Sequence, residues 1–216
     1  ALTLSSPNSF TSATMNAGPD SQSSASAVIG NYGALGSGTI TLGNSSSMTA
    51  LYFLPATGTG TLANNVVLSS PTSAITTRLL MDETNLTATL SGLVSGGNAN
   101  QELLFDNDSG SSDVGKIRLT NASNSFIVSR IRLNRGGLVV TSDGALGNPA
   151  NSLTLDVTSG TAGSGLILEG SLTLGSGRSL SVASQTVVDT QATADILNGG
   201  ITCTGQVVKR GSASLR

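Results

Sequence analysis

The sequence predicts an all-β fold of the solenoid class, in which short parallel strands stack into a rod. Three observations lead to this prediction. Short segments of alternating apolar and polar residues recur along the 216 residues, and turn-forming residues separate them. Two blocks of sequence also return in the same order, as in repeat proteins.

Composition limits the classes of protein to which the chain can belong. Charged residues make up 10% of it and the formal net charge is -2, whereas a nucleic-acid-binding protein needs a basic excess. Disorder is disfavoured because 38% of the residues are hydrophobic. Histidine is absent, which removes His-dependent nucleophile arrangements and His-ligated metal sites. No apolar run approaches the roughly 18 residues of a membrane span.

The expected strands are short, and the residues between them are mostly Gly, Asn, Ser and Asp, which favour turns. Strands of this length are shorter than those of a β-sandwich, which is the alternative fold. The alternating segments occupy residues 2–4, 40–42, 86–90, 117–119, 131–133, 153–155, 166–168, 172–174 and 180–182. With one face inward, the buried residues should be Leu119, Leu133, Leu153, Leu155, Leu168 and Leu174, and the exposed ones Arg118, Arg132 and Thr154.

An internal repeat supports the solenoid. The tetrapeptide Gly-Ala-Leu-Gly at 33–36 returns at 144–147, an offset of 111, and Asn-Ser-Phe at 8–10 returns at 124–126, an offset of 116. We therefore expect one solenoid segment of a longer chain over residues 1–216, with repeats over about 1–114 and 115–213 and a third beginning near Ser214. The repeat positions are Asn8, Phe10, Leu35, Gly36, Asn124, Phe126, Leu146 and Gly147.

These residues stand in an order that resembles the autotransporter-associated β-strand repeat: Lys-x-Gly at 209–211, then Leu-x-Leu, Asn-x-Phe, Gly-x-Leu and Ala-Leu-Gly. The resemblance covers most of residues 1–55 and 115–185. It departs from the family pattern after Asn-x-Phe, where the usual Gly is missing, and over 56–114. The resemblance implies a right-handed parallel β-helix, as in bacterial passenger domains and other exported surface proteins.

Half of the ten basic residues lie between positions 116 and 135 and alternate with Ile and Leu. On stacked strands they would point outward and lie near one another. An anionic glycan or lipid head group could bind to such a stripe, or the acidic turn at 106–113 or a sister molecule could neutralise it. The stripe consists of Lys116, Arg118, Arg130, Arg132 and Arg135.

The densest acidic cluster follows residue 105. A calcium-binding turn at Asp106, Asp108 and Asp113 is one interpretation, and a solvated turn with Asx hydrogen bonds is the favoured one. An enzyme acting on polysaccharides would need convergent carboxylates. The only dense supply for such an enzyme is Asp82, Glu83, Glu102, Asp106 and Asp108, in the stretch that fits the repeat least.

The sequence therefore predicts a structural segment of an exported cell-surface or extracellular protein, with no catalysis and no cofactor. The alternatives are a glycan- or matrix-binding adhesin and a polysaccharide lyase or hydrolase. Partners would be neighbouring repeats of the parent chain, sister molecules joined end to end, or a surface glycan. Asn8 and Asn124 should form amide ladders at turns, and Cys203 should be buried as a small apolar residue.

Overall fold

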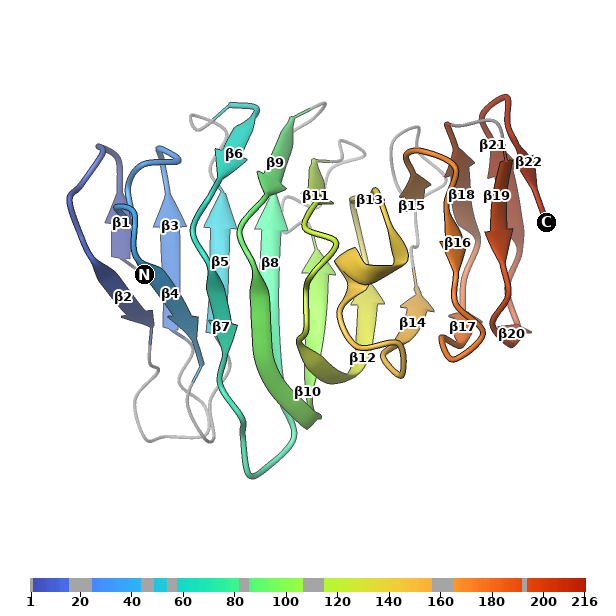
Figure 1. Cartoon of the computed structure of the whole chain (residues 1–216), viewed down its shortest axis with the longest axis horizontal. Helices are drawn as coiled ribbons and strands as arrows, with labels where there is room; N and C mark the ends of the chain where they lie inside the picture. Colours follow the sequence, from blue (N-terminus) through green and yellow to red (C-terminus); the bar gives the residue numbers. More distant parts are fainter. Residues whose placement is uncertain are drawn as a thin grey trace.

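The computed structural model describes residues 2–15, 25–43, 49–53, 58–81, 86–106, 115–156, 165–191 and 194–216. Short strands lie side by side along the long axis of the molecule, from β1 at one end to β22 at the other (Figure 1). All strand pairs of the described residues are parallel. The predicted parallel β-solenoid is confirmed, and its right hand stays a prediction.

Each turn of the solenoid has three sides, visited in the same order along the chain. Side I is the longest row of paired strands. It contains β1 (Leu2–Leu4), β3 (Ala25–Ile29), β5 (Thr49–Phe53), β8 (Ile75–Met81), β10 (Val94–Asp106), β12 (Ile127–Leu133), β14 (Ser152–Leu155), β17 (Leu180–Val182) and β20 (Ile201–Cys203).

Side II follows side I along the chain and forms a separate sheet. It contains β6 (Gly60–Leu62), β9 (Thr87–Leu90), β11 (Lys116–Leu119), β13 (Gly137–Val140), β15 (Gly165–Leu168), β18 (Thr186–Thr190) and β21 (Val207–Arg210). In the first two turns of the solenoid, residues 5–10 and 31–36 take the place of a side II strand.

Side III closes each turn and is the least regular. Its strands are β2 (Ser12–Met15), β4 (Thr39–Leu42) and β7 (Val66–Leu68) at one end, and β16 (Thr173–Leu174), β19 (Ala194–Leu197) and β22 (Ser214–Leu215) at the other. In the middle it holds the 3-10 turn η2 (Asp143–Leu146). Where side III is not a regular strand, its buried backbone N–H and C=O groups need hydrogen-bond partners from side chains.

Strand β10 bends from side III into side I. Its first residues pair with β7 and residues 101–106 pair with β8. Gly96 and Gly97 lie at the bend with φ of 78° and 75°, a region that residues with a side chain rarely adopt. A Cβ atom at Gly96 would lie 2.3 Å from the carbonyl oxygen of Leu68, so this corner requires glycine.

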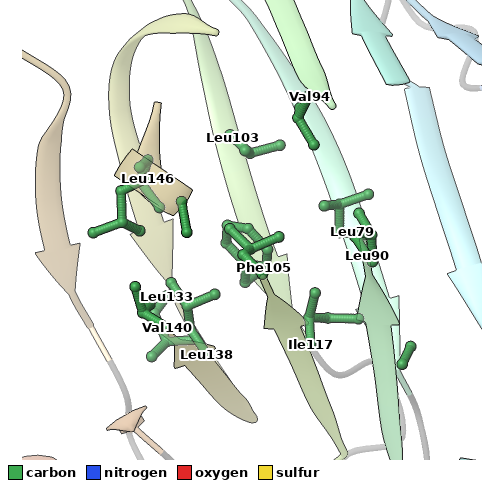
Figure 2. Close-up of a cluster of buried hydrophobic side chains, with 14 of the residues drawn as sticks. Leu79, Leu90, Val94, Leu103, Phe105, Ile117, Leu133, Leu138, Val140 and Leu146 are labelled. Carbon is green, nitrogen blue, oxygen red and sulfur yellow. The ribbon is translucent and has the colours of Figure 1, made fainter. Parts of the chain in front are cut away.

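The core is built from columns of inward side chains, one from each turn. Side I contributes Ala27, Leu51, Leu79, Phe105, Leu133, Leu155 and Val182, paired in register. Side II contributes Ala88, Ile117, Leu138, Leu166 and Val188. Figure 2 shows Phe105 and Leu133 beside Ile117, Leu138 and Val140 in this core. Burying each large side chain contributes roughly 1.5–3 kcal/mol.

The predicted inward register is confirmed. Its six leucines, at positions 119, 133, 153, 155, 168 and 174, are at most 3% exposed. Arg118, Arg132 and Thr154 point outward as expected, but each is only half exposed. For the two arginines the reason is that their guanidinium groups lie against acidic side chains of other turns.

The repeat starts lie on successive sides of the solenoid. From β1 on side I the chain returns to side I at β3, β5, β8 and β10, and then reaches β11 on side II. From β11 it returns to side II at β13, β15, β18 and β21, and then reaches β22 on side III. These strands hold Leu2, Ile117 and Leu215, so each repeat advances by four turns and one further side.

Cys203 is exposed, so the prediction that it is buried is wrong. It occupies the inward column of side I after Val182. Because β20 is the last described strand of that row, only one neighbouring turn covers the thiol. An inward position is buried only where turns lie on both sides of it.

Candidate functional sites in the charged surface and the Ala-Leu-Gly turns

The five basic residues of the predicted stripe lie on two sides of the solenoid. Lys116 and Arg118 belong to β11 on side II, and Arg130 and Arg132 belong to β12 on side I. Arg135 is exposed in the connection between β12 and β13. The structure therefore brings them together in two groups and does not form one continuous stripe.

Carboxylates of other turns neutralise the arginines of side I. Glu102 forms ion pairs with both Arg130 and Arg132, and Arg132 also contacts Asp156 with an N–O distance of 2.8 Å. In the paired register Arg130 faces Glu102 directly. Neutralisation, one of the two expected alternatives, therefore holds for Arg130 and Arg132, and their partners are Glu102 and Asp156 rather than the acidic turn at 106–113.

Two further ion pairs extend this pattern. Arg78 contacts Asp106 at 2.8 Å, and the Asp106 side chain is 7% exposed. On side II, Arg118 reaches Glu169 at 2.6 Å, although the Arg118 position pairs with Val139 of the intervening strand. These pairs tie non-adjacent or successive turns together and leave fewer free cations for an anionic ligand.

The acidic groups predicted for calcium or for catalysis are only partly described. Asp106 lies in the ion pair with Arg78 and also accepts a hydrogen bond from Asn134 at 3.2 Å. Asp82, Glu83, Asp108 and Asp113 lie outside the described residues. Within the described ranges, no three His, Cys, Asp or Glu side chains converge as metal ligands would.

The two Ala-Leu-Gly turns have the same backbone geometry on different sides. We call residues 31–38 the first turn and residues 142–151 the second turn; both are local backbone turns and are distinct from the coils of the solenoid. Gly36 and Gly147 have φ of 68° and 71°, which favours glycine at this position. Three backbone hydrogen bonds of the first turn have counterparts in the second. In the first turn they run from Ala34 N to Asn31 O, from Gly36 N to Gly33 O and from Ser37 N to Phe10 O. In the second turn they run from Ala145 N to Ser142 O, from Gly147 N to Gly144 O and from Asn148 N to Phe126 O.

The repeat asparagines fasten these turns to the preceding turn of the solenoid. Asn8 Nδ2 donates to Ala34 O at 2.8 Å, and Asn124 Nδ2 donates to Ala145 O at the same distance. Asn124 also accepts from Val94 N at 2.8 Å, so it joins three turns. Asn8 and Asn124 lie on different sides and do not stack on each other, and both bond backbone groups, so they form no amide ladder with one another.

The second turn encloses Arg178, whose side chain is fully buried. Its Nε donates to Asp143 Oδ1 at 2.8 Å. The two terminal nitrogens donate to five backbone carbonyl oxygens at 3.1–3.4 Å, those of Asp143, Leu146, Gly147, Asn148 and Asn151. The turn is therefore a cup of carbonyl oxygens filled by one guanidinium, with a carboxylate as counter-charge.

The first turn holds Asn64 at the position of Arg178. Each stands two residues before the next strand, and the residues that follow them, Asn65 and Ser179, accept equivalent bonds from Ile40 N and Leu153 N, both 2.8 Å. Asn64 Nδ2 donates to Gly36 O and Gly38 O at 3.1 and 2.7 Å. The shorter amide leaves an open cavity of about 340 Å³, lined by Tyr32, Gly33, Gly36, Ser37, Thr61, Ala63 and Asn64.

Tyr32 forms one wall of this cavity. Its hydroxyl donates to Gly58 O at 2.9 Å, and its ring stacks on Phe53 with centroids 5.8 Å apart. Burial raises the pKa of Tyr32 to about 12, although a hydrogen bond with the Gly60 backbone lowers it. The wall is thus a neutral aromatic ring over the physiological pH range.

We expect the stability of the protein to fall as the pH rises from 10 toward 12. In this window the unfolded chain releases the Tyr32 proton while the folded protein retains it, because the folded pKa is the higher one, so deprotonation favours unfolding. Melting temperatures of the wild type and of Tyr32→Phe across this range measure the effect. The wild type should lose more than the variant, and parallel curves would contradict the assignment.

Sequence reasoning missed Asn64, Arg178, Asp143 and Tyr32. The available signal was the match between the two turns, which places Tyr32 and Asp143 at the same offset of 111 as Gly33 and Gly144. No helix in the described part of the chain is long and apolar enough to cross a membrane. The chain matches no known protein family, no curated protein and no solved structure.

Proposed function

We propose that the chain is a structural, rod-like segment of an exported bacterial cell-surface or extracellular protein of the autotransporter-associated type. The observation that carries this proposal is the unbroken column of apolar residues through successive turns, from Ala27 to Val182. Stacked turns of this kind can be extended by repetition, because each contacts only its neighbours. Such a rod can hold a further domain away from a surface.

The outward ion pairs support the same role. Glu102, Asp106, Asp156 and Glu169 each pair with an arginine of another turn. Ion pairs between turns suit a structural role for these four carboxylates, and we propose no catalytic activity and no cofactor. The adhesin alternative relies on the basic residues, and a salt-sensitive glycan pull-down tests it. Cleavage of a polysaccharide by the purified chain would favour the enzyme alternative.

The partners in this proposal are neighbouring repeats of the same parent chain or sister molecules joined end to end. Among the described strands, β1 and β20 each pair on one edge only, as do β2, β21 and β22. Such edges present unpaired backbone groups that can pair with another chain. Ile201 on β20 is 52% exposed and would be covered by such a contact.

We therefore expect the isolated segment to associate as its concentration rises. Sedimentation velocity across a concentration series measures this. Ile201→Lys should weaken association because it places a charge at the exposed edge, while Ile127→Lys, at a residue 44% exposed on the inner strand β12, should not. A clean monomer at the highest concentration, with β1 and β20 protected from hydrogen exchange, contradicts end-to-end contact.

A further inference from the structure

We infer that the cavity of the first turn is a binding site for a guanidinium group, namely an arginine side chain carried by a partner polypeptide. The second turn provides the precedent within the same molecule. There a guanidinium occupies a cup of five carbonyl oxygens, and the first turn has the same backbone geometry. The proposal concerns a binding site that the rod-like role does not require.

The carbonyl oxygens of the first turn are only partly used. Asn64 takes those of Gly36 and Gly38, which correspond to Gly147 and Asn151 in the second turn. Of the remaining equivalents, Tyr32 and Ser37 line the cavity, and the carbonyl of neither accepts a hydrogen bond from another described residue. The third equivalent, Leu35, is buried and does not line the cavity. A guanidinium presents five N–H donors in a planar fork, so it can reach several carbonyl oxygens at once.

The wall of the cavity fits a cation as well. Where the second turn has the carboxylate of Asp143 beside the guanidinium, the first turn has the aromatic ring of Tyr32. One face of this ring stacks on Phe53, so only the other face can attract a guanidinium by its negative potential. None of the seven residues that line the cavity carries a charge, so no cation there opposes the ligand. Because the counter-charge is absent, we expect weak binding, with a dissociation constant in the millimolar range for a single arginine.

The ligand must come from outside the turn. Asn64 is too short to fill the cavity, since its amide bonds only two carbonyl oxygens, and the space of about 340 Å³ remains open. Arg178 fills the corresponding space from its own backbone position two residues before β17. An arginine from a partner would enter the first cup from the solvent side, past the exposed residues Ser37, Thr61 and Ala63.

The direct test is an NMR titration of the whole 216-residue chain with N-acetyl-arginine-N-methylamide. The amide signals of Gly33, Gly36 and Thr61 should shift and saturate. The citrulline analogue, which has the same shape without the charge, should shift them at least tenfold less, and so should a neutral methyl glycoside. An arginine-containing peptide should bind more tightly than the single residue. No saturable shift, or equal shifts with citrulline, overturns the proposal.

A variant that fills the cavity gives an independent test. Asn64→Arg should place its own guanidinium in the cup, as Arg178 does, and should abolish the shifts caused by the ligand. Thr202→Arg adds the same charge at an exposed position on β20 and should bind the ligand as the wild type does. Unchanged binding by Asn64→Arg overturns the proposal, and so does equal loss in both variants, because the attraction would then depend on net charge.

Chemical rescue of an Arg178 variant tests whether the carbonyl cup of the second turn can bind a free guanidinium, independently of binding at the first turn. Arg178→Ala empties the second cup, and methylguanidinium should raise the melting temperature of this variant by more than it raises that of the wild type. If Arg178→Ala is rescued while the wild type shows no binding at the first turn, a carbonyl cup accepts a guanidinium but the first cavity does not. That result contradicts the proposal and leaves the role of the rod untouched.

Discussion

Replacing Arg178 by alanine is expected to lower the free energy of unfolding by about 3 kcal/mol, the lower end of the range for removing one partner of a buried ion pair, because the Asp143 side chain that remains is 24% exposed. The variant leaves the Asp143 carboxylate without its cation and removes one donor from five carbonyl oxygens, of which those of Leu146 and Asn148 keep a hydrogen bond from Asn151. Unsatisfied buried groups of this kind carry their full desolvation cost. Urea unfolding followed by circular dichroism measures the change.

The matched control for this prediction is Arg135→Ala. Arg135 is exposed and makes no ion pair with any other described residue, so the change should stay within about 0.5 kcal/mol. The double variant Arg178→Ala, Asp143→Ala should lose less than the sum of the two single losses, because it removes both members of the pair. Equal, small losses for Arg178→Ala and Arg135→Ala would mean that the guanidinium does not hold the second turn.

The two repeat phenylalanines should respond very differently to truncation. Phe126 is 0% exposed and Phe10 is 45% exposed, although both precede an Ala-Leu-Gly turn and accept the same backbone hydrogen bond. Phe126→Ala should cost about 3–5 kcal/mol, since it opens a cavity in the packed interior. Phe10→Ala should cost less than about 1 kcal/mol, because little apolar area is returned to water.

Thermal and urea unfolding of both variants measure this difference. The pair compares one side chain at one repeat position, so the difference in stability reports burial rather than chemistry. A loss of similar size in both variants would show that the turn geometry, which they share, dominates over burial. A larger loss of stability for Phe10→Ala than for Phe126→Ala would contradict the exposed position of Phe10 and the buried position of Phe126.

The alternating leucines predicted correctly which side chains point into the core. A strand places every second side chain on the same face, so Leu-Thr-Leu at 153–155 predicts two buried residues and one outward residue whatever the neighbouring turns contain. The same argument failed for Cys203, because periodicity gives the face of a strand and not its place along the rod. Burial of an inward residue also depends on which turns cover it.

The charges and the turns were harder to predict. The basic residues between 116 and 135 are close in sequence, but β11 and β12 belong to different sides of the solenoid. The alternating pattern of each strand does not show on which side of the solenoid that strand lies. The partners of these basic residues, Glu102, Asp156 and Glu169, lie up to 51 residues away. Arg178 was overlooked because its burial also depends on residues distant in sequence. A single basic residue among glycines is expected to be exposed, and only the structure shows that residues 142–151 enclose it.

The advance of one side per repeat makes the rod a three-fold screw. A feature encoded once in each repeat reappears about 120° around the axis and, at about 4.8 Å per turn, roughly 21 Å farther along it. Successive copies therefore point in three directions, and the fourth would face the same way as the first. A filament built from this repeat would look alike from three directions about 120° apart, and deleting one side of a single turn would rotate everything beyond it.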